Sequence, residues 1–381
     1  MPISIEQKKD CCGCTACQQV CPKHCIKMVQ DEEGFLYPEL SLKQCVDCGL
    51  CEKVCPEINP LDGCIPLECY AAKNKEQEIR KESSSGGIFS LIADYVLAQN
   101  GVVFGARFDE NWHVIMDYTD KKEDLKKFRG SKYVKCDIGD SYAQVKHFLT
   151  IGRKVLYTGS SCQIAGLRKY LRHDYSNLLL VDYLCHGAPS PLLWKKYLEE
   201  ISCNNISSLT NISFRNKKRG WKKFSMSIER GDEILADSIF SDNVYMKAFL
   251  SDISLRPSCY HCVARNGHSG SDITIGDHWA IRDIDSSFDD DEGVSLVLVN
   301  TSRGANIFDK LDVICEPTDF ESSKKWNGAF YERTEEHLHR KRFFQELQYR
   351  SDVSSLIEEE LKITLWDHMK KRFLKVIKHK L

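Results

Sequence analysis

Cysteines are the residues of this chain whose spacing most clearly specifies chemistry. The run C-x2-C-x2-C-x3-C-P occurs twice, and every cysteine of the second copy follows its counterpart at the same interval. In bacterial ferredoxins such a run binds a cubane 4Fe-4S cluster, and its fourth cysteine binds the cluster of the other run. We therefore predict two clusters, one bound by Cys11, Cys14, Cys17 and Cys55, and the other by Cys45, Cys48, Cys51 and Cys21.

A zinc site is the alternative interpretation of these cysteines. Zinc takes four ligands in total, usually from two separated C-x-x-C pairs, so two compact four-cysteine runs fit it poorly. Cys12 and Cys25 have no place in the ligand spacing, and we expect them to be packing thiols. The two runs thus favour one-electron transfer over a structural metal site.

Four later cysteines are candidates for a third metal site. Cys162 and Cys185 each follow an expected strand, and ligands of open α/β sheets bind at the carboxyl ends of strands. Cys259 and Cys262 form a C-x-x-C pair that would complete four ligands. Isolated buried cysteines are common, and a lone C-x-x-C can also hold zinc or perform dithiol chemistry. Spacing alone leaves these interpretations open.

Composition limits the class of protein. The chain has 381 residues, which predicts more than one folding unit. Charged residues make up 28% and the formal net charge is -2, which indicates neither a disordered chain nor a general nucleic-acid binder. The N-terminus has no apolar signal core and no apolar run is long enough to span a bilayer, so we expect a cytoplasmic protein without a transmembrane segment. In that reducing compartment, clustered thiols favour metal ligation over disulfides.

The elements that position the first cysteines are short. Residues 26–29 and 35–38 predict a hairpin between the two cysteine runs, with Gly34 free to adopt a positive φ. This duplicated arrangement predicts an α+β ferredoxin-like domain over residues 1–60. A linker with Pro60, Gly63 and Pro66 is expected next, over residues 61–69.

Alternating strands and helices follow the linker. The patterns predict strands at 70–73, 102–107, 154–157 and 178–182, and helices at 86–99, 141–149, 163–171 and 192–201. A hairpin is expected at 224–229 and 234–239, with later strands at 273–276 and 295–300. This order predicts a larger α/β domain over residues 70–320 with a mixed, partly parallel sheet. A helical C-terminal extension is expected over 321–381, ending in an amphipathic docking helix at 356–381.

Several motifs after Cys69 occur in an order that resembles a known family. They lie at residues 84–87, 129–133, 159–166, 185–191 and 271–277. These segments are similar to the beta-subunit family of coenzyme F420 hydrogenases and dehydrogenases, from about Cys69 to the 340s, and an N-terminal ferredoxin module is a common fusion in that family. The resemblance implies a flavin, normally FAD, and a third 4Fe-4S cluster close to it. Its implied ligands are Cys162, Cys185, Cys259 and Cys262.

A flavin dinucleotide also needs a site for its pyrophosphate. Glycine-rich backbone at a helix N-terminus suits that anion, and residues 85–87 supply it, although serine and glycine are equally ordinary capping residues. Lys132 is a candidate phosphate or flavin-ring contact, with a solvated basic loop as the alternative. The chain has no G-x-G-x-x-G fingerprint, which disfavours an ordinary NAD site. We expect flavin contacts from Ser85, Gly86, Gly87, Gly130, Ser131, Lys132, Thr158 and Gly159.

The expected function is that of an iron-sulfur flavoprotein oxidoreductase. Clusters pass single electrons, whereas a flavin exchanges one electron or a hydride equivalent, so the expected order is N-terminal clusters, third cluster, flavin, substrate. The expected partners are ferredoxin or another redox carrier, a small-molecule acceptor or the deazaflavin F420, and a partner enzyme subunit, without nucleic acid. Related bacterial proteins occur beside genes for surface polysaccharide assembly, which suggests that setting. The alternative is a non-catalytic subunit that transfers electrons between a partner enzyme and a redox carrier.

No catalytic residue is predicted. His186, His261, His268 and His278 lie near the motifs, and His186 is the best candidate proton donor, although packing is the ordinary role for each. The segment 214–221 carries basic residues beside aromatics, a pattern that nucleic-acid sites also use. In a redox protein we expect it to form a loop that meets an acidic partner or anionic substrate phosphates.

Overall fold

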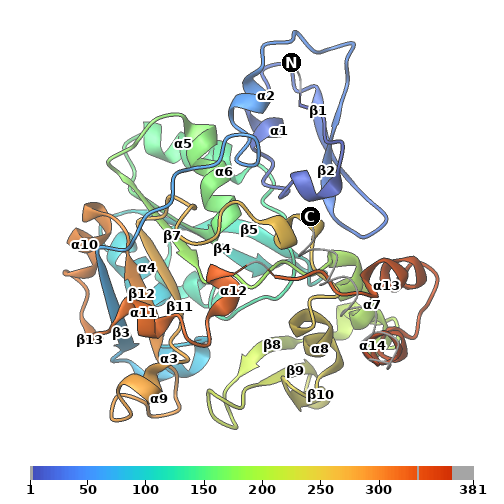
Figure 1. Cartoon of the computed structure of the whole chain (residues 1–381). Helices are drawn as coiled ribbons and strands as arrows, with labels where there is room; N and C mark the ends of the chain where they lie inside the picture. Colours follow the sequence, from blue (N-terminus) through green and yellow to red (C-terminus); the bar gives the residue numbers. More distant parts are fainter. Residues whose placement is uncertain (1–2, 333, 363–381) are drawn as a thin grey trace, which may run out of the picture.

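The computed structural model of the chain describes residues 3–332 and 334–362. A small N-terminal module lies at the top in Figure 1, above a large sheet flanked by helices, and a smaller sheet with further helices lies at the lower right. This is the predicted α+β module followed by an α/β region with a mixed, partly parallel sheet. The N-terminal module and the large sheet together determine where the cysteines lie.

The N-terminal module consists of two cysteine turns and a hairpin. The hairpin strands β1 (Ile26–Gln30) and β2 (Leu36–Leu40) pair antiparallel, as predicted. Asp31 Oδ1 accepts the amides of Glu33 and Phe35 at 3.1 and 2.8 Å, which closes the turn. The short helices α1 (Ala16–Val20) and α2 (Leu50–Lys53) each begin after a residue in the left-handed region within a cysteine run, namely Thr15 and Gly49. A 3-10 turn η1 (Lys8–Asp10) precedes the first run.

The large sheet has eight strands in the order β13-β3-β12-β11-β7-β6-β4-β5. Its central strands β11, β7, β6 and β4 are parallel, and the pairs toward both edges are antiparallel. The carboxyl ends of these four parallel strands therefore lie at one edge. The strands are β3 (Glu68–Asn74), β4 (Val102–Phe108), β5 (Val114–Thr119), β6 (Val155–Ser160), β7 (Leu178–Tyr183), β11 (Ile273–Asp277), β12 (Ser295–Val299) and β13 (Val313–Pro317).

Alternating side chains of the sheet bury both of its faces. Val102, Phe104 and Tyr157 face one layer, formed by α5 (Ser141–Thr150), α6 (Ser161–Leu171) and part of the N-terminal module. Val103 and Leu156 face the other layer, formed by α4 (Ile88–Leu97) and α10 (Ser302–Phe308). A strand buried on both faces reads as a continuous apolar run, which explains why these strands were recognisable in the sequence.

A second, three-stranded sheet forms a separate core that the sequence did not predict as a unit. Strands β8 (Asn211–Asn216), β9 (Ser225–Arg230) and β10 (Glu233–Ile239) are antiparallel, and β9 and β10 form the expected hairpin. The same apolar cluster includes residues of α7 (Pro191–Ile201), α8 (Val244–Leu250), α13 (Arg340–Leu347) and α14 (Val353–Leu361). The described part of the C-terminal extension thus packs against the body of the protein, and residues 363–381 of the expected terminal helix lie outside the described residues.

Shorter helical segments complete the described chain. They are α3 (Gln77–Glu82), η2 (Lys122–Lys127), η3 (Ile206–Ser208), η4 (Pro257–His261), α9 (Ile281–Ile284), α11 (Phe320–Ser323) and α12 (Gly328–Tyr331). Among residues 3–332 and 334–362, no helix has the length and apolar character needed to cross a bilayer.

The N-terminal module is fixed to the rest of the molecule by direct contacts. Glu33, in the hairpin turn, forms a two-pronged ion pair with Arg340 of α13. Ser190, the N-cap of α7, donates a hydrogen bond to Glu33 O. Cys12 and Cys14 lie in one apolar cluster with α5 and α6. The cysteine turns are therefore held against the large sheet.

Candidate functional site

The eight cysteines of the two N-terminal runs line two cavities. The first cavity, with about 310 Å³ of empty space, is lined by Cys11, Cys14, Cys17 and Cys55 among other residues. The second cavity, with about 340 Å³, is lined by Cys21, Cys45, Cys48 and Cys51 among other residues. Each cavity thus takes its fourth cysteine from the other run, which is the exchange expected of a two-cluster ferredoxin.

The donor chemistry of these cavities fits iron-sulfur clusters. In the described residues, no group of three or more histidine, cysteine and carboxylate side chains is arranged to hold a metal ion. Thiolates that bind the corners of a cube stand farther apart than the ligands of one ion, so a cavity lined by four thiols is the relevant feature. The eight cysteines remain the predicted ligands.

The cysteines of the two cavities differ in their exposure to solvent. The four cysteines of the first cavity are all buried. In the second cavity Cys48 is exposed and Cys45 is half-buried, whereas Cys21 and Cys51 are buried. An external molecule can therefore approach two of the thiols of the second cavity.

Cys12 and Cys25, expected to be packing thiols, line the cavities as fifth cysteines. Cys25 lies in the second cavity, with its sulfur 3.3 Å from that of Cys21. Cys12 lines the first cavity, and hydrogen bonds with the thiols of Cys14 and Cys162 raise its pKa well above the usual value. Cys12 thereby joins the first cavity to the later cysteines, a link that the spacing did not indicate.

The later cysteines lie at the carboxyl edge of the large sheet. Cys162 is in the first turn of α6, directly after β6, and Cys185 follows the adjacent parallel strand β7. Ser160 caps α6 through a reciprocal pair of hydrogen bonds with Gln163, which fixes the turn that carries Cys162. Cys259 lies in η4 and Cys262 directly after it. Strand topology thus explains the placement of Cys162 and Cys185.

Electrostatic interactions show that these four cysteines, the third cysteine set, are neighbours. Burial is the main cause that raises the pKa of Cys185, and the charges of Cys259, Cys162 and Cys262 raise it further. A hydrogen bond from Cys12 lowers the pKa of Cys162, and the charge of Lys135 contributes in the same direction. Lys135 Nζ donates to Cys12 O at 2.9 Å. The structure brings together the four predicted ligands and places Cys12 beside them.

Arg256 provides a direct test of whether the first cavity suits an anionic group. Its guanidinium donates to Cys11 O at 2.7 Å and to Leu36 O at 3.0 Å. The remaining terminal nitrogen, Nη1, is buried without a hydrogen-bond partner in the described residues. A Cβ built on Gly13 would lie 3.0 Å from Nη1, so the donor is packed against the cysteine turn. A buried, unsatisfied donor at this turn fits a 4Fe-4S cluster bound by thiolates.

The two loops expected to contact a flavin lie side by side. Ser84 Oγ accepts hydrogen bonds from the amide and the hydroxyl of Ser131 at 2.6 and 2.9 Å. Gly87 is the N-cap of α4 with φ +83°, and it has no side-chain cap. A Cβ on Gly130 would meet nothing within 4 Å, so space is open there. The two loops therefore lie together, with open space at Gly130.

Several of the expected flavin donors already have partners within the chain. Lys132 Nζ donates to the carbonyls of Arg129 and Gly130 at 3.0 and 3.1 Å, and burial lowers its pKa to about 8. Ser85 Oγ donates to Val294 O at 2.8 Å. Gly86 N donates to Ser295 Oγ at 3.0 Å, and Thr158 Oγ1 donates to Phe104 O at 2.8 Å. Gly159 lies within β6. The expected flavin contacts remain predictions.

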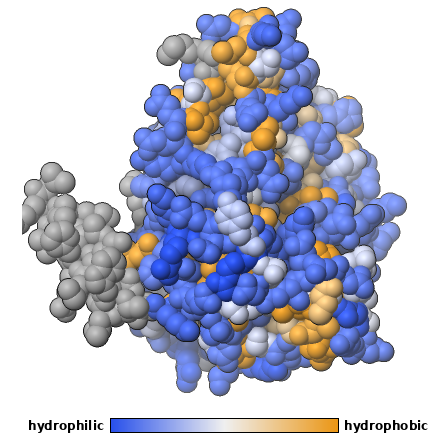
Figure 2. All heavy atoms as spheres, turned by 90° about the vertical axis from the view of Figure 1, so that its right-hand side faces the viewer, coloured by the Kyte–Doolittle hydropathy of each residue, from blue (hydrophilic) through white to orange (hydrophobic). Residues whose placement is uncertain are grey.

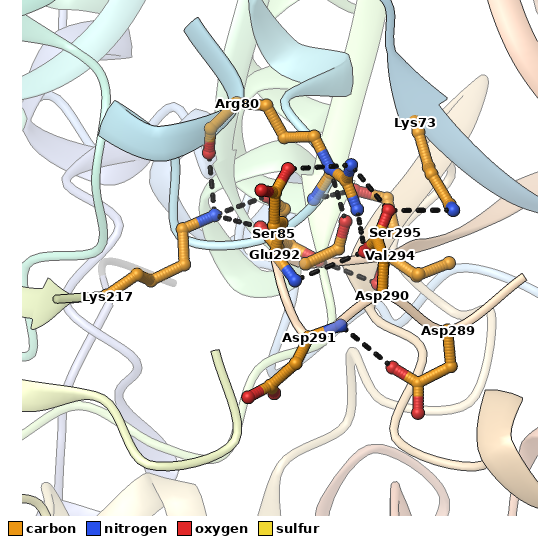
Figure 3. A network of polar contacts seen from close by, with 12 residues as sticks. Lys73, Arg80, Ser85, Lys217, Asp289, Asp290, Asp291, Glu292, Val294 and Ser295 are labelled. Atoms are coloured by element: carbon orange, nitrogen blue, oxygen red, sulfur yellow. Dashed lines mark hydrogen bonds and ion pairs between the residues drawn. The ribbon is translucent and has the colours of Figure 1, made fainter. Parts of the chain in front are cut away.

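A polar network holds the loop at residues 84–87 in place (Figure 3). Lys217 Nζ donates to the carbonyls of Arg80, Ser85 and Glu292 at 2.6, 3.0 and 2.7 Å. Burial, with the charges of Arg215 and Arg80, lowers the pKa of Lys217 to about 7. Arg80 in turn donates to Gly293 O and to Asp290. Lys217, directly after β8, and Arg80 of α3 thus link the loop at residues 84–87 to the acidic segment 289–292.

Asp290 should contribute pH-dependent stability through this network. Burial alone would raise its pKa, but hydrogen bonds from Arg80 and Lys73 outweigh burial and hold the pKa well below 3.8. A carboxyl whose pKa is lower in the folded chain stabilises the fold above the unfolded pKa of about 3.9 and loses that effect as the pH falls. Because this carboxylate is 39% exposed, we discount for screening and expect Asp290→Asn to cost about 1 kcal/mol at pH 7.

Urea titrations at several pH values would measure this effect. The difference between wild type and Asp290→Asn should shrink as the pH falls below about 4. Asp312→Asn is the control, because Asp312 pairs with Lys75 at an 82% exposed position and its replacement should change the free energy of unfolding little. Parallel profiles for wild type and Asp290→Asn would contradict the assignment.

The basic segment 214–221 is exposed only at its turn, at Lys218 and Arg219. Phe214, Arg215 and Trp221 are buried, and Arg215 forms two 2.9 Å hydrogen bonds to Asp277. Trp221 stacks on Trp279 with ring centroids 4.6 Å apart. The expectation of a partner-binding loop was therefore wrong for these residues, since the aromatic neighbours bury the cation.

Three of the four histidines near the motifs are held by the surrounding structure. His186 Nε2 lies 2.7 Å from Asp252 Oδ1, and its ring packs against Phe249. His268 Nδ1 forms a hydrogen bond with Leu61 O. Burial lowers the pKa of His278 to about 4. His261 is exposed. These contacts assign no proton-transfer role to the four residues.

Comparisons with known proteins identify the family of the chain and its N-terminal domain. Two models of the family described as "Coenzyme F420 hydrogenase/dehydrogenase, beta subunit" match the chain, the N-terminal model at residues 69–140 and the C-terminal model at residues 152–315. Residues 10–58 match the "4Fe-4S dicluster domain". A solved structure of the F420-reducing NiFe hydrogenase complex from Methanosarcina barkeri is 20% identical, covers 71% of this chain and 91% of its own, and gives a TM-score of 0.49. No curated protein matches the chain.

Proposed function

Because the chain belongs to the coenzyme F420 hydrogenase/dehydrogenase beta-subunit family and carries a 4Fe-4S dicluster domain, we propose that it is an iron-sulfur flavoprotein oxidoreductase. The observation that carries the proposal is the succession of three cysteine sets. Cys48 of the second cavity is exposed, the four cysteines of the first are buried, and Cys12 of the first lies against Cys162 of the third. This succession suits electron transfer from the surface to the edge of the large sheet.

Different residues of the chain would hold the clusters and the flavin. When bound, the clusters supply one-electron transfer and a flavin supplies the change to two-electron chemistry. The cysteines of the two cavities and the third cysteine set would hold the clusters. The loops at 84–87 and 129–132 would hold FAD, with Gly130 leaving room for it. Burial of the first cavity would keep water away from the middle of the route.

A surface around the second cavity suits an electron carrier. Leu42 and Val46 are 73% and 55% exposed, and Val46 lines the cavity itself. Figure 2 shows apolar residues gathered at the top of the molecule, on the N-terminal module. Lys23, Lys43 and Lys53 are exposed around them. We call these five residues the entrance surface: Lys23, Leu42, Lys43, Val46 and Lys53.

The charges of the entrance surface favour an acidic partner. None of its three lysines forms an ion pair within residues 3–332 and 334–362, whereas the nearby Asp47 and Glu52 interact within the chain. Lys27 lies opposite Glu39 in the β1–β2 pair, so these charges offset one another. The proposed partner is therefore a small one-electron carrier with an acidic surface, such as a ferredoxin.

Reversing two charges of the entrance surface should slow reduction by such a carrier. In stopped-flow mixing with a reduced acidic ferredoxin, Lys43→Glu/Lys53→Glu should react about tenfold more slowly at low ionic strength. The difference should disappear at high salt, because exposed charges are screened. Unchanged kinetics of the double variant at low salt would rule out this docking surface.

A matched control separates docking from net charge. Lys121→Glu/Lys126→Glu also reverses two exposed lysines, but at η2, on the face of the sheet away from the N-terminal module. This control variant should react like wild type. A slowing equal to that of Lys43→Glu/Lys53→Glu would show a general charge effect and not a local one.

Flavin content distinguishes an oxidoreductase from a non-catalytic electron-transfer subunit. Reconstituted full-length chain should contain about one flavin, and a reduced ferredoxin should then drive turnover of F420 or of a sugar-linked acceptor from surface polysaccharide assembly. These are the two substrate classes that the resemblance suggests. A chain that holds clusters but never flavin would instead be a subunit that wires a partner enzyme to a carrier.

A further inference from the structure

Arg256 is a buried cation that lacks a carboxylate partner in the described chain. It is 1% exposed, and its side chain forms two hydrogen bonds to carbonyls but no ion pair there. An unpaired buried charge and an unsatisfied buried donor both destabilise a fold. The fold keeps Arg256 in this position despite both effects, which indicates that an anion completes its surroundings.

The groups that interact with the charge of Arg256 include cysteines of two different sites. Burial would lower the pKa of Arg256, but the charges of Cys11, Tyr37, Cys12 and Cys259 together raise it. Cys11 belongs to the first cavity and Cys259 to the third cysteine set. The guanidinium carbon also lies 4.2 Å from the centre of the Tyr37 ring, which fixes the cation over the hairpin.

The backbone of Arg256 belongs to the segment that carries the third cysteine set. Its amide donates to Ala188 O, and its carbonyl accepts from Cys259 N, both at 2.9 Å. Its side chain reaches Cys11 and packs against Gly13. One residue therefore joins the third cysteine set, through its main chain, to the first cavity, through its charge.

Two other charged groups lie near this position. Lys135, a half-buried second cation, donates from Nζ to Cys12 O at 2.9 Å. Glu57 lines the first cavity without an ion pair to Arg256. Two cations, Arg256 and Lys135, therefore lie near Cys11 and Cys12.

We propose that the positive charge of Arg256 raises the reduction potential of the cluster bound in the first cavity, so that this cluster accepts electrons from the second. The inference rests on the proposed function only in assuming that the N-terminal clusters are present. Potentials of 4Fe-4S clusters depend on nearby charge, hydrogen bonds and solvent exposure. One electron moves from one cluster to the other, no bond changes, and no proton moves because arginine stays protonated.

The experiment is a potentiometric titration of the reconstituted full chain, followed by electron paramagnetic resonance. Arg256→Met removes the charge at similar volume, and Arg256→Lys keeps it. Arg256→Met should reduce the share of a transferred electron held by one N-terminal cluster about tenfold. This corresponds to a reduction potential that is lower by about 59 mV. Arg256→Lys should remain close to wild type. Lys126→Gln, in η2 on the opposite face of the large sheet, is the control for an exposed charge and should leave the first cluster unchanged.

The outcomes separate this inference from the proposed function. Unchanged potentials in an Arg256→Met protein with full iron content would overturn the role of Arg256, whatever the flavin content. Repeating the titration in a Cys48→Ala background, which removes a ligand of the second cavity, assigns the shift to one of the two clusters. A shift confined to the second cluster would also overturn the role of Arg256. If Arg256→Met loses iron, the iron content of Arg256→Gln and Arg256→Lys decides the question. Loss of iron from the neutral variants alone supports a role for the positive charge beside the cluster. Equal loss from Arg256→Lys contradicts that role.

Discussion

Cys259→Ala should reduce the iron content of the reconstituted chain from about twelve to about eight atoms. Cys259 lies beside Cys162, Cys185 and Cys262, as their mutual effects on pKa indicate. Removing one thiolate leaves three, and the third cluster then lacks a corner ligand. Electrons from a reduced ferredoxin should still reach the N-terminal clusters but no longer reduce a flavin. Iron analysis and anaerobic visible spectra measure both effects.

Cys203→Ala is the matched control for this change. Cys203 is exposed in the turn after α7, and it belongs to none of the three cysteine sets. Its replacement should leave iron, spectrum and electron transfer unchanged. If Cys259→Ala keeps all of its iron and its spectrum, the third cysteine set does not bind a cluster and the route ends at the first cavity.

Trp194→Ala should lower the free energy of unfolding by about 3–5 kcal/mol. Trp194 is 1% exposed in α7 and packs against Phe214 and Tyr245 with ring centroids 5.0 and 5.1 Å apart. Its indole nitrogen donates to Trp112 O at 2.8 Å, so the change leaves both a cavity and an unpaired carbonyl. Urea titration of the circular dichroism signal measures the loss.

The exposed Trp326 provides the control for Trp194. Trp326 is 67% exposed, and Trp326→Ala should change stability by no more than about 0.5 kcal/mol. α7 directly follows the segment with Cys185, so loosening this core should also weaken the third cluster. Equal stability of the two variants would contradict the view that the small sheet and α7 form one cooperative core.

Local patterns in the sequence were sufficient for much of the fold. Buried strands such as β6 and β7 read as short apolar runs, and amphipathic helices such as α5 begin where their periodicity begins. The N-terminal hairpin followed from the turn at Asp31–Gly34. The edge strands β5 and β13 were missed, because half-exposed strands have weak patterns and depend on pairing with distant partners.

The candidate site was predictable where spacing defines it and not where separate segments meet. Repeated spacing identified the eight N-terminal cysteines, and strand order explained why Cys162 and Cys185 lie at one edge. The contact of Arg256 with Gly13 joins segments more than two hundred residues apart, and no local pattern encodes it. The same limit explains Arg215, whose burial depends on Asp277 and on neighbouring aromatic rings.

The most direct test of the central claim is anaerobic purification of the full chain with iron, sulfide and flavin measured per chain. Three clusters and one bound flavin predict about twelve irons, about twelve sulfides and about one flavin. About eight irons without flavin would contradict the route from the entrance surface to the large sheet, and would leave only a two-cluster ferredoxin module.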